Sequence, residues 1–228
     1  PSRQDEGEEE MKRLFAILVL CWLPVLAEAE PWFIEAAVGT AHHYRYHSEG
    51  DNYWRTDAYP GESYDMDSLA WRLGIGRRLP EGWSKWSVTA SWLNLGRNSI
   101  RNGRGVSDDD YDSNEHRCLR NCDRVYRVDL TGKAKGPELA LRRDFDNGLY
   151  ARGGLFLWLS EVRGTIQDPT GYANPYYERK EMLAPFMGGG YRYKGFFLEV
   201  NGYQALGSGF PLSKRVLTST IGMQFPLK

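Results

Sequence analysis

Apolar side chains recur at every second position in one segment after another of this chain, and this alternation constrains the fold more than any other feature. In segment 32–41, for example, Trp32, Ile34 and Val38 share one phase, whereas Glu35 falls in the other. Successive side chains of a β-strand point to opposite faces, so the pattern predicts strands that each have one apolar face. Eight segments show it, at residues 32–41, 68–79, 86–92, 137–145, 149–159, 182–193, 196–205 and 216–225.

The connectors between these segments alternate between short and long. Strands of about ten residues, even in number, with short turns at one rim and long loops at the other, are typical of transmembrane β-barrels. We therefore predict an all-β, eight-stranded antiparallel up-and-down transmembrane β-barrel with short periplasmic turns and long extracellular loops. Alternation within 124–133 predicts that the fourth strand also extends well above the membrane. The predicted turns are 80–85, 146–148 and 194–195, and the predicted loops are 42–67, 93–135, 161–181 and 206–215.

A soluble secreted barrel of the lipocalin type, or a β-sandwich, is the main alternative, because its apolar phase would point inward. Two features favour the membrane. Aromatic residues gather at the ends of the predicted strands, where they are suited to interfacial girdles, namely Trp32, Trp71, Trp86, Trp92, Tyr191, Tyr193 and Phe225. Ionisable residues occupy the opposite phase, where the interior of a small barrel lets acids and arginines pair. This predicted interior charge network consists of Glu35, Arg72, Glu138, Arg142, Arg152, Arg192 and Glu199.

Composition agrees with a barrel and excludes a helical membrane bundle. The longest apolar run, 14–27, is shorter than the stretch of about 20 residues that a spanning helix needs. Alternating strands need only half of their residues apolar, so a hydrophobic fraction of 41% suffices. The 29 basic and 30 acidic side chains nearly balance, and we expect no nucleic-acid partner.

The N-terminal region has the three parts of a secretory signal peptide in order. Met11-Lys12-Arg13 is basic, 14–26 is apolar, and Ala27-Glu28-Ala29 is a small-residue cleavage site. We expect 1–10 to be an upstream extension or scar, 11–29 the signal peptide, and 30–228 the outer-membrane barrel.

Export would place the two remaining cysteines in an oxidising compartment, so we expect a disulfide between Cys118 and Cys122. A metal site formed by both thiols and His116 is the alternative, but the spacing fits no common zinc pattern. We expect no metal and no other cofactor.

The run 135–141, Lys-Gly-Pro-Glu-Leu-Ala-Leu, leads to Phe145 and then to a short turn. With the signal peptide and the eight-strand meander, it resembles the OmpA/OmpX-like small outer-membrane β-barrels of Gram-negative bacteria. The resemblance implies an outer-membrane location, contact with outer-membrane lipids and lipopolysaccharide, and a monomer. Such barrels usually end on an aromatic residue, whereas here Phe225 is followed by Pro226-Leu227-Lys228.

Two functional alternatives follow from the polar interior and from the histidines. Eight strands leave no wide lumen, so the interior charges are expected to form a plug, with a narrow gated pore as the alternative. A lipid A-modifying enzyme would need a nucleophile, a histidine and an acid close together. The candidates all lie in predicted loops, so we expect no enzyme; they are His42, His43, His47, Ser48, Glu49 and His116.

The long loops are the remaining functional surface. They combine tyrosine, tryptophan and arginine, a composition suited to protein or glycan contact, and 97–104 is basic enough to bind phosphates of lipopolysaccharide. We therefore predict a non-enzymatic barrel that acts in envelope integrity or in surface adhesion, with a host protein or glycan as a possible ligand. The loop contact candidates are Tyr44, Tyr46, Tyr53, Trp54, Arg97, Arg101 and Arg104.

Overall fold

The computed structural model describes residues 32–44, 63–106, 111–112, 117–118, 125–168, 170–206 and 212–227. For the described residues 104–106, 111–112, 117–118 and 125–126 it describes the backbone alone. Antiparallel strands form almost all of this described part of the chain. The strands are β1 Trp32–Tyr44, β2 Ser63–Asp65, β3 Asp67–Arg78, β4 Trp86–Val106, β5 Tyr111–Asp112, β6 Arg117–Cys118, β7 Val125–Asp144, β8 Leu149–Gln167, β9 Ala173–Tyr193, β10 Phe196–Gln204 and β11 Arg215–Pro226.

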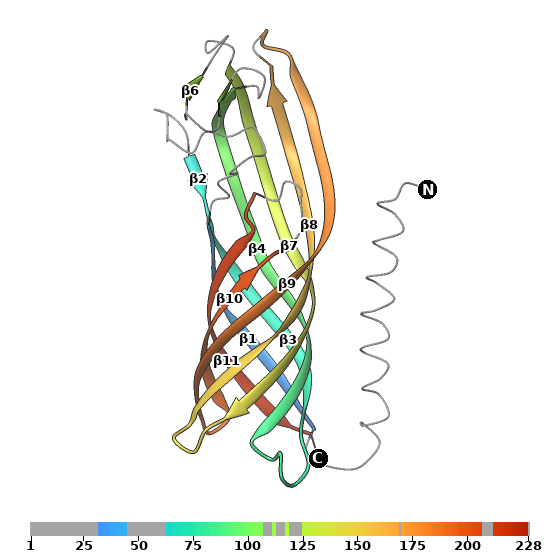
Figure 1. The fold of residues 1–228 in the computed structure, drawn as a ribbon, viewed down its shortest axis with the longest axis vertical. Helices are drawn as coiled ribbons and strands as arrows, with labels where there is room; N and C mark the ends of the chain where they lie inside the picture. Colours follow the sequence, from blue (N-terminus) through green and yellow to red (C-terminus); the bar gives the residue numbers. More distant parts are fainter. Residues whose placement is uncertain are drawn as a thin grey trace, which may run out of the picture.

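The long strands pair with their neighbours in the chain and close into a ring. β1 pairs with both β3 and β11, and β4 pairs with both β3 and β7, so no long strand is left at an edge at the level of the ring. The short β2 continues the line of β3 beyond Met66 and pairs with β4. This topology confirms the predicted eight-stranded up-and-down barrel (Figure 1).

Three short turns join the strands at one rim, at the predicted positions. They lie between β3 and β4, between β7 and β8, and between β9 and β10. In the last, Lys194 and Gly195 have φ angles of 48° and 87°. Positive φ at both central residues matches the right-handed twist of the paired strands, which explains so tight a connection.

Two of the predicted long loops are wrong, because much of 93–135 and of 161–181 is strand. β4 continues to Val106, β7 begins at Val125, and β8 and β9 form a hairpin whose turn spans 168–172. In this region charged side chains replace aliphatic ones on the outward face, so the apolar contrast that revealed the other strands is weak. The predicted extension of the fourth strand is confirmed, and Figure 1 shows β4, β7, β8 and β9 continuing beyond the ends of β1, β10 and β11.

The barrel is apolar on its outside at the level of the ring. In β1, Ile34 and Val38 are exposed while Phe33, Glu35 and Ala37 are buried. A barrel in water would turn the aliphatic phase inward, so this direction excludes the soluble alternative. A transmembrane barrel requires such an outward apolar band. Exposed members of the band are Ile34, Val38, Leu69, Leu73, Ile75, Leu141, Leu149, Leu198, Val200, Leu217, Ile221 and Met223.

None of the described residues forms a helix long and apolar enough to span a bilayer.

Candidate functional sites inside and above the barrel

Buried charges from four strands meet in the half of the barrel nearer the short turns. Arg72 Nη1 of β3 lies 2.6 Å from Glu199 Oε1 of β10, and Arg152 Nη1 of β8 lies 2.9 Å from the same oxygen. Arg152 Nη2 also lies 2.6 Å from Glu138 Oε1 of β7. Each of these side chains is at most 3% exposed, so the pairs are almost fully desolvated.

The other predicted charges extend this cluster toward the periplasmic rim. Glu35 Oε1 lies 3.2 Å from Arg72 Nε, and Arg142 Nη1 lies 3.8 Å from Glu35 Oε2. Arg142 and Arg192 then share Asp144, with nitrogen–oxygen distances of 3.3 and 3.0 Å. The structure thus brings all seven predicted interior charges, together with Asp144, into one continuous set of eight side chains, which we call the charged layer.

Four uncharged side chains that bind the charged layer are not among the residues predicted from the sequence. Tyr150 and Tyr203 donate hydrogen bonds from their hydroxyls to Glu199 and Glu138, at 3.0 and 2.8 Å. Ser91 donates to Glu138, and the Asn201 side-chain amide donates to Glu199. All four occupy the strand phase of the charges, which is the signal that would have found them.

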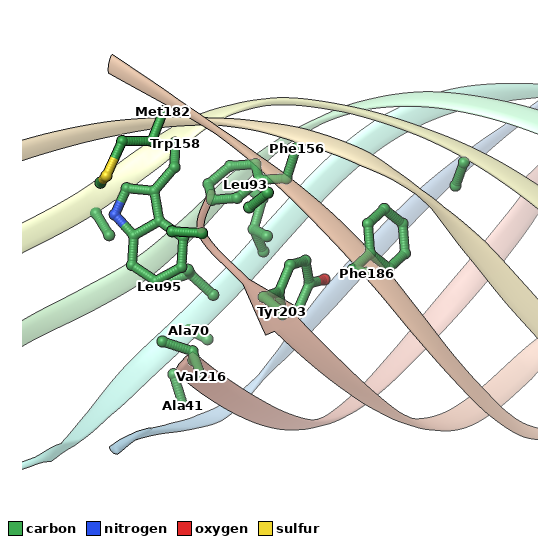
Figure 2. Packing of buried hydrophobic residues seen from close by; sticks show 14 residues of the cluster. Ala41, Ala70, Leu93, Leu95, Phe156, Trp158, Met182, Phe186, Tyr203 and Val216 are labelled. Atoms are coloured by element: carbon green, nitrogen blue, oxygen red, sulfur yellow. The ribbon is translucent and has the colours of Figure 1, made fainter. Parts of the chain in front are cut away.

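An apolar layer fills the barrel interior beyond the charged layer (Figure 2). Phe156 packs against Trp158 and Tyr203 with ring centroids 5.8 Å apart, and Phe186 stacks on Tyr203 at 5.0 Å. The predicted polar interior is therefore only one of two layers inside the barrel. On β8 the inward residues change from Arg152 to aromatic rings, which obscured the alternation in the sequence.

Two of the candidate histidines lie on β1, so their assignment to a loop is wrong. His42 faces outward, with Nδ1 2.7 Å from Asp67 Oδ1. His43 is buried, and its Nε2 lies 3.1 Å from Ser68 Oγ and 3.0 Å from the Leu95 carbonyl oxygen.

The His43 and Ser68 contact lacks the arrangement of a hydrolase. A carbonyl oxygen only accepts hydrogen bonds, so the contact with Leu95 places the proton on His43 Nε2. The Ser68 hydroxyl itself donates to Leu95 at 2.6 Å. His43 Nε2, the ring nitrogen nearest the Ser68 hydroxyl, is therefore protonated and cannot act as a general base toward that hydroxyl.

The other candidate residues are only partly covered. Tyr44, Arg97 and Arg101 are described and exposed, at the end of β1 and on β4. Arg104 and Cys118 are described by backbone alone. Tyr46, Tyr53, Trp54, His47, Ser48, Glu49, His116 and Cys122 lie outside the described residues. Within the described part of the chain, no three His, Cys, Asp or Glu side chains are grouped to hold a metal ion.

Strands β4, β7, β8 and β9 form a four-stranded sheet above the apolar band, which we call the projecting sheet. Its inner face has an apolar cluster of its own, in which Val128, Leu130 and Val162 pack with Leu212. At the hairpin tip the Thr170 hydroxyl and the Thr170 and Tyr172 backbone amides donate to Asp168. These hydrogen bonds, the Thr170 hydroxyl above all, lower the pKa of Asp168.

The outward face of the projecting sheet is mainly basic where it meets the apolar band. The register aligns Arg97, Lys133, Glu161 and Arg179 in one row across the four strands, which we call the basic row. Glu161 already pairs with Arg163, with a nitrogen–oxygen distance of 2.6 Å. Below this row on β8, Leu159 and Leu155 are part-exposed in the same phase, with the buried Leu157 between them, so positive charge lies directly above apolar surface.

No family model and no curated protein sequence matches the chain. Solved structures match with low identity. Ail, the attachment invasion locus protein of Yersinia pestis, in complex with the heparin analogue sucrose octasulfate, has 12% identity and a TM-score of 0.44, over 87% of this chain and 100% of that one. Neisserial surface protein A has 10% identity and a TM-score of 0.40, over 85% and 96%. The translocator domain of autotransporter NalP from Neisseria meningitidis has 10% identity and a TM-score of 0.34, over 96% and 95%. The barrel assignment follows from the closed strand ring and its outward apolar band.

Proposed function

We propose that this chain is a non-enzymatic β-barrel of the Gram-negative outer membrane that acts by surface contact, through the projecting sheet. One observation carries the proposal: the eight strands enclose a filled interior, while four of them continue outward and present the basic row. A filled interior leaves the outside surface as the place where a partner binds.

The chemistry of the basic row favours phosphorylated glycolipid as the partner. Arg97 and Arg179 are exposed, and Lys133 lies between their strands in the same row. Lipopolysaccharide combines acyl chains, which suit the apolar band, with phosphates, which suit cations directly above that band. Contact with several such molecules would support envelope integrity, because cations that link phosphates hold neighbouring molecules together.

The non-enzymatic part of the proposal is supported by the described histidines. His43 is buried and bonded to a carbonyl oxygen, and His42 is paired with Asp67. Neither has a serine or cysteine nucleophile poised at a free ring nitrogen among the contacts of the described residues.

Binding of purified lipopolysaccharide to the barrel in phospholipid nanodiscs tests the role of the basic row. The variant Arg97→Gln/Lys133→Gln/Arg179→Gln should bind roughly tenfold more weakly, because three exposed ionic contacts at about 0.2–1 kcal/mol each are lost. Affinity should also fall as salt is raised.

Lys180→Gln is the matched control. Lys180 neighbours Arg179 on β9 but faces inward and pairs with Glu178 at 3.0 Å, so its loss should leave the affinity unchanged. Equal affinity of the triple variant and the wild type would remove lipopolysaccharide contact from the proposal.

A further inference from the structure

A second cationic position lies at the opposite rim of the barrel and faces lipid. Arg143 is exposed on β7, in the outward phase, whereas its neighbours Arg142 and Asp144 belong to the charged layer. The outward residue on one side of it is Leu141 of the apolar band, and on the other side is Phe145 at the short turn. Arg143 therefore lies where the band ends on the periplasmic side.

Two aromatic rings hold the Arg143 side chain. The guanidinium carbon lies 5.4 Å from the centroid of the Trp86 ring and 5.6 Å from that of Phe145. Trp86 is directly opposite Arg143 in the register of β4 and β7. Stacking on flat rings stabilises a guanidinium and limits its rotamers, while its N–H groups stay available at the edge of the plane.

The charge of Arg143 is not matched by a carboxylate among the described residues, unlike the charges of Lys85, Arg142 and Arg192. Lys85 pairs with Asp146 at 2.8 Å, and Arg142 and Arg192 pair with Asp144 inside the barrel. A stacked guanidinium at the edge of an apolar surface is suited to an anionic group from outside the chain.

Small side chains leave a shallow area on the outward surface beside Arg143. Ala151 of β8 lies opposite Arg143 in the register, and Gly189 of β9 lies opposite Ala151. These residues project little from the sheet, and they adjoin the exposed Leu141 and Leu149. A ligand at this position needs one anionic group for the guanidinium and apolar chains for the surface next to it.

We infer that Arg143, held by Trp86 and Phe145, forms a binding site for the phosphate of an anionic glycerophospholipid in the periplasmic leaflet. Two guanidinium N–H groups donate to two phosphate oxygens, and the acyl chains lie along the apolar band beside Ala151 and Leu141. Together with the basic row at the other rim, the site fixes the depth of the barrel in the membrane. The inference does not rest on the proposed contact with lipopolysaccharide.

Native mass spectrometry of the refolded barrel in detergent tests the inference, with phosphatidylglycerol as the probe. The wild type should retain phosphatidylglycerol, and Arg143→Gln should retain roughly tenfold less, because the charge-assisted hydrogen bonds are lost. Arg143→Lys should fall in between, since it keeps the charge but loses the planar fork. Inorganic phosphate, which has no acyl chains, should not displace the lipid at equal concentration.

The controls separate a defined site from general attraction. Lys85→Gln removes a rim cation that is already paired and should leave retention unchanged. Trp86→Leu and Phe145→Leu keep the charge and should weaken retention by loosening the guanidinium. Heat-modifiable migration on a denaturing gel shows that each variant is folded. Retention by folded Arg143→Gln equal to wild type, or an equal loss in Lys85→Gln, would overturn the inference. The triple variant of the basic row should retain phosphatidylglycerol normally, so the two proposals can fail separately.

Discussion

At the scale of single residues, the interior charges show what strand phase can and cannot predict. The phase opposite the aliphatic residues is enough to place Glu35, Arg72 and Glu199 inside. It does not give their partners, because Arg72 and Glu199 come from β3 and β10, which are not adjacent in the sheet. Asp144 has the same phase on β7 as Glu138 and Arg142, but it is not in the predicted network, because phase alone does not show that it bridges Arg142 and Arg192.

Glu199 is the residue whose loss should cost most, because it accepts hydrogen bonds from Arg72, Arg152 and Tyr150. Glu199→Gln keeps the shape of the side chain but removes the negative charge that pairs with the buried guanidinium groups of Arg72 and Arg152. We expect the free energy of unfolding to fall by about 3–5 kcal/mol, measured by urea unfolding in lipid vesicles. Glu81→Gln, in the exposed turn before β4, should change it by at most about 0.5 kcal/mol. Similar values for the two variants would contradict the structural role of the charged layer.

At the scale of elements, the sequence predicts which segments are strands better than it predicts where they end. Within the bilayer the outward face must be apolar, so alternation there is strong. Beyond the apolar band, outward residues such as Arg163 are charged and exposed, so the contrast between the two faces disappears. The strands continue because backbone pairing between β8 and β9 and the inner apolar cluster support them.

Gly96 lies where β4 passes from the barrel wall into the projecting sheet. The register of β4 against β7 shifts between Asn94 and Arg97, and Gly96 has a φ of 78°. A Cβ at this position would lie 2.5 Å from Ser68 Oγ and 2.6 Å from the Leu69 carbonyl oxygen.

We therefore expect Gly96→Ala to lower the free energy of unfolding by about 1–3 kcal/mol more than Gly82→Ala does. Gly82 is the matched control, because its φ of 90° gives a similar backbone strain but a Cβ there meets nothing within 4 Å. Urea unfolding of both variants measures the difference, and equal losses would show that the space at the bulge is not limiting.

At the scale of the whole molecule, the two interior layers block the barrel in different ways. The charged layer fixes its ions in pairs, and the apolar layer packs the rings of Phe156, Phe186 and Tyr203 together, so an ion passing there would have to give up its water among packed rings. The sequence predicts only the charged layer. Phe156 and Trp158 alternate with leucines of the outward phase, so both faces of this part of β8 are apolar and the alternation between polar and apolar residues is lost.

We expect the folded protein to give no stepwise current in planar lipid bilayers, in which a wide porin serves as the positive control. Heat-modifiable migration of the same preparation confirms that the inserted protein is folded. Reproducible single-channel steps from folded protein would show that the interior opens and would restore the narrow gated pore as its function.

The charged layer joins strands that are not adjacent in the sheet, and this restricts the order in which the barrel can assemble. Arg72 of β3 meets Glu199 of β10 only after the first and last parts of the chain have come together. A partly formed sheet in the lipid would carry unpaired ions, each at a cost of several kcal/mol. Strand-by-strand entry is therefore disfavoured, and we expect insertion and ring closure to occur as a single kinetic step, limited by the arrival of the C-terminal strands.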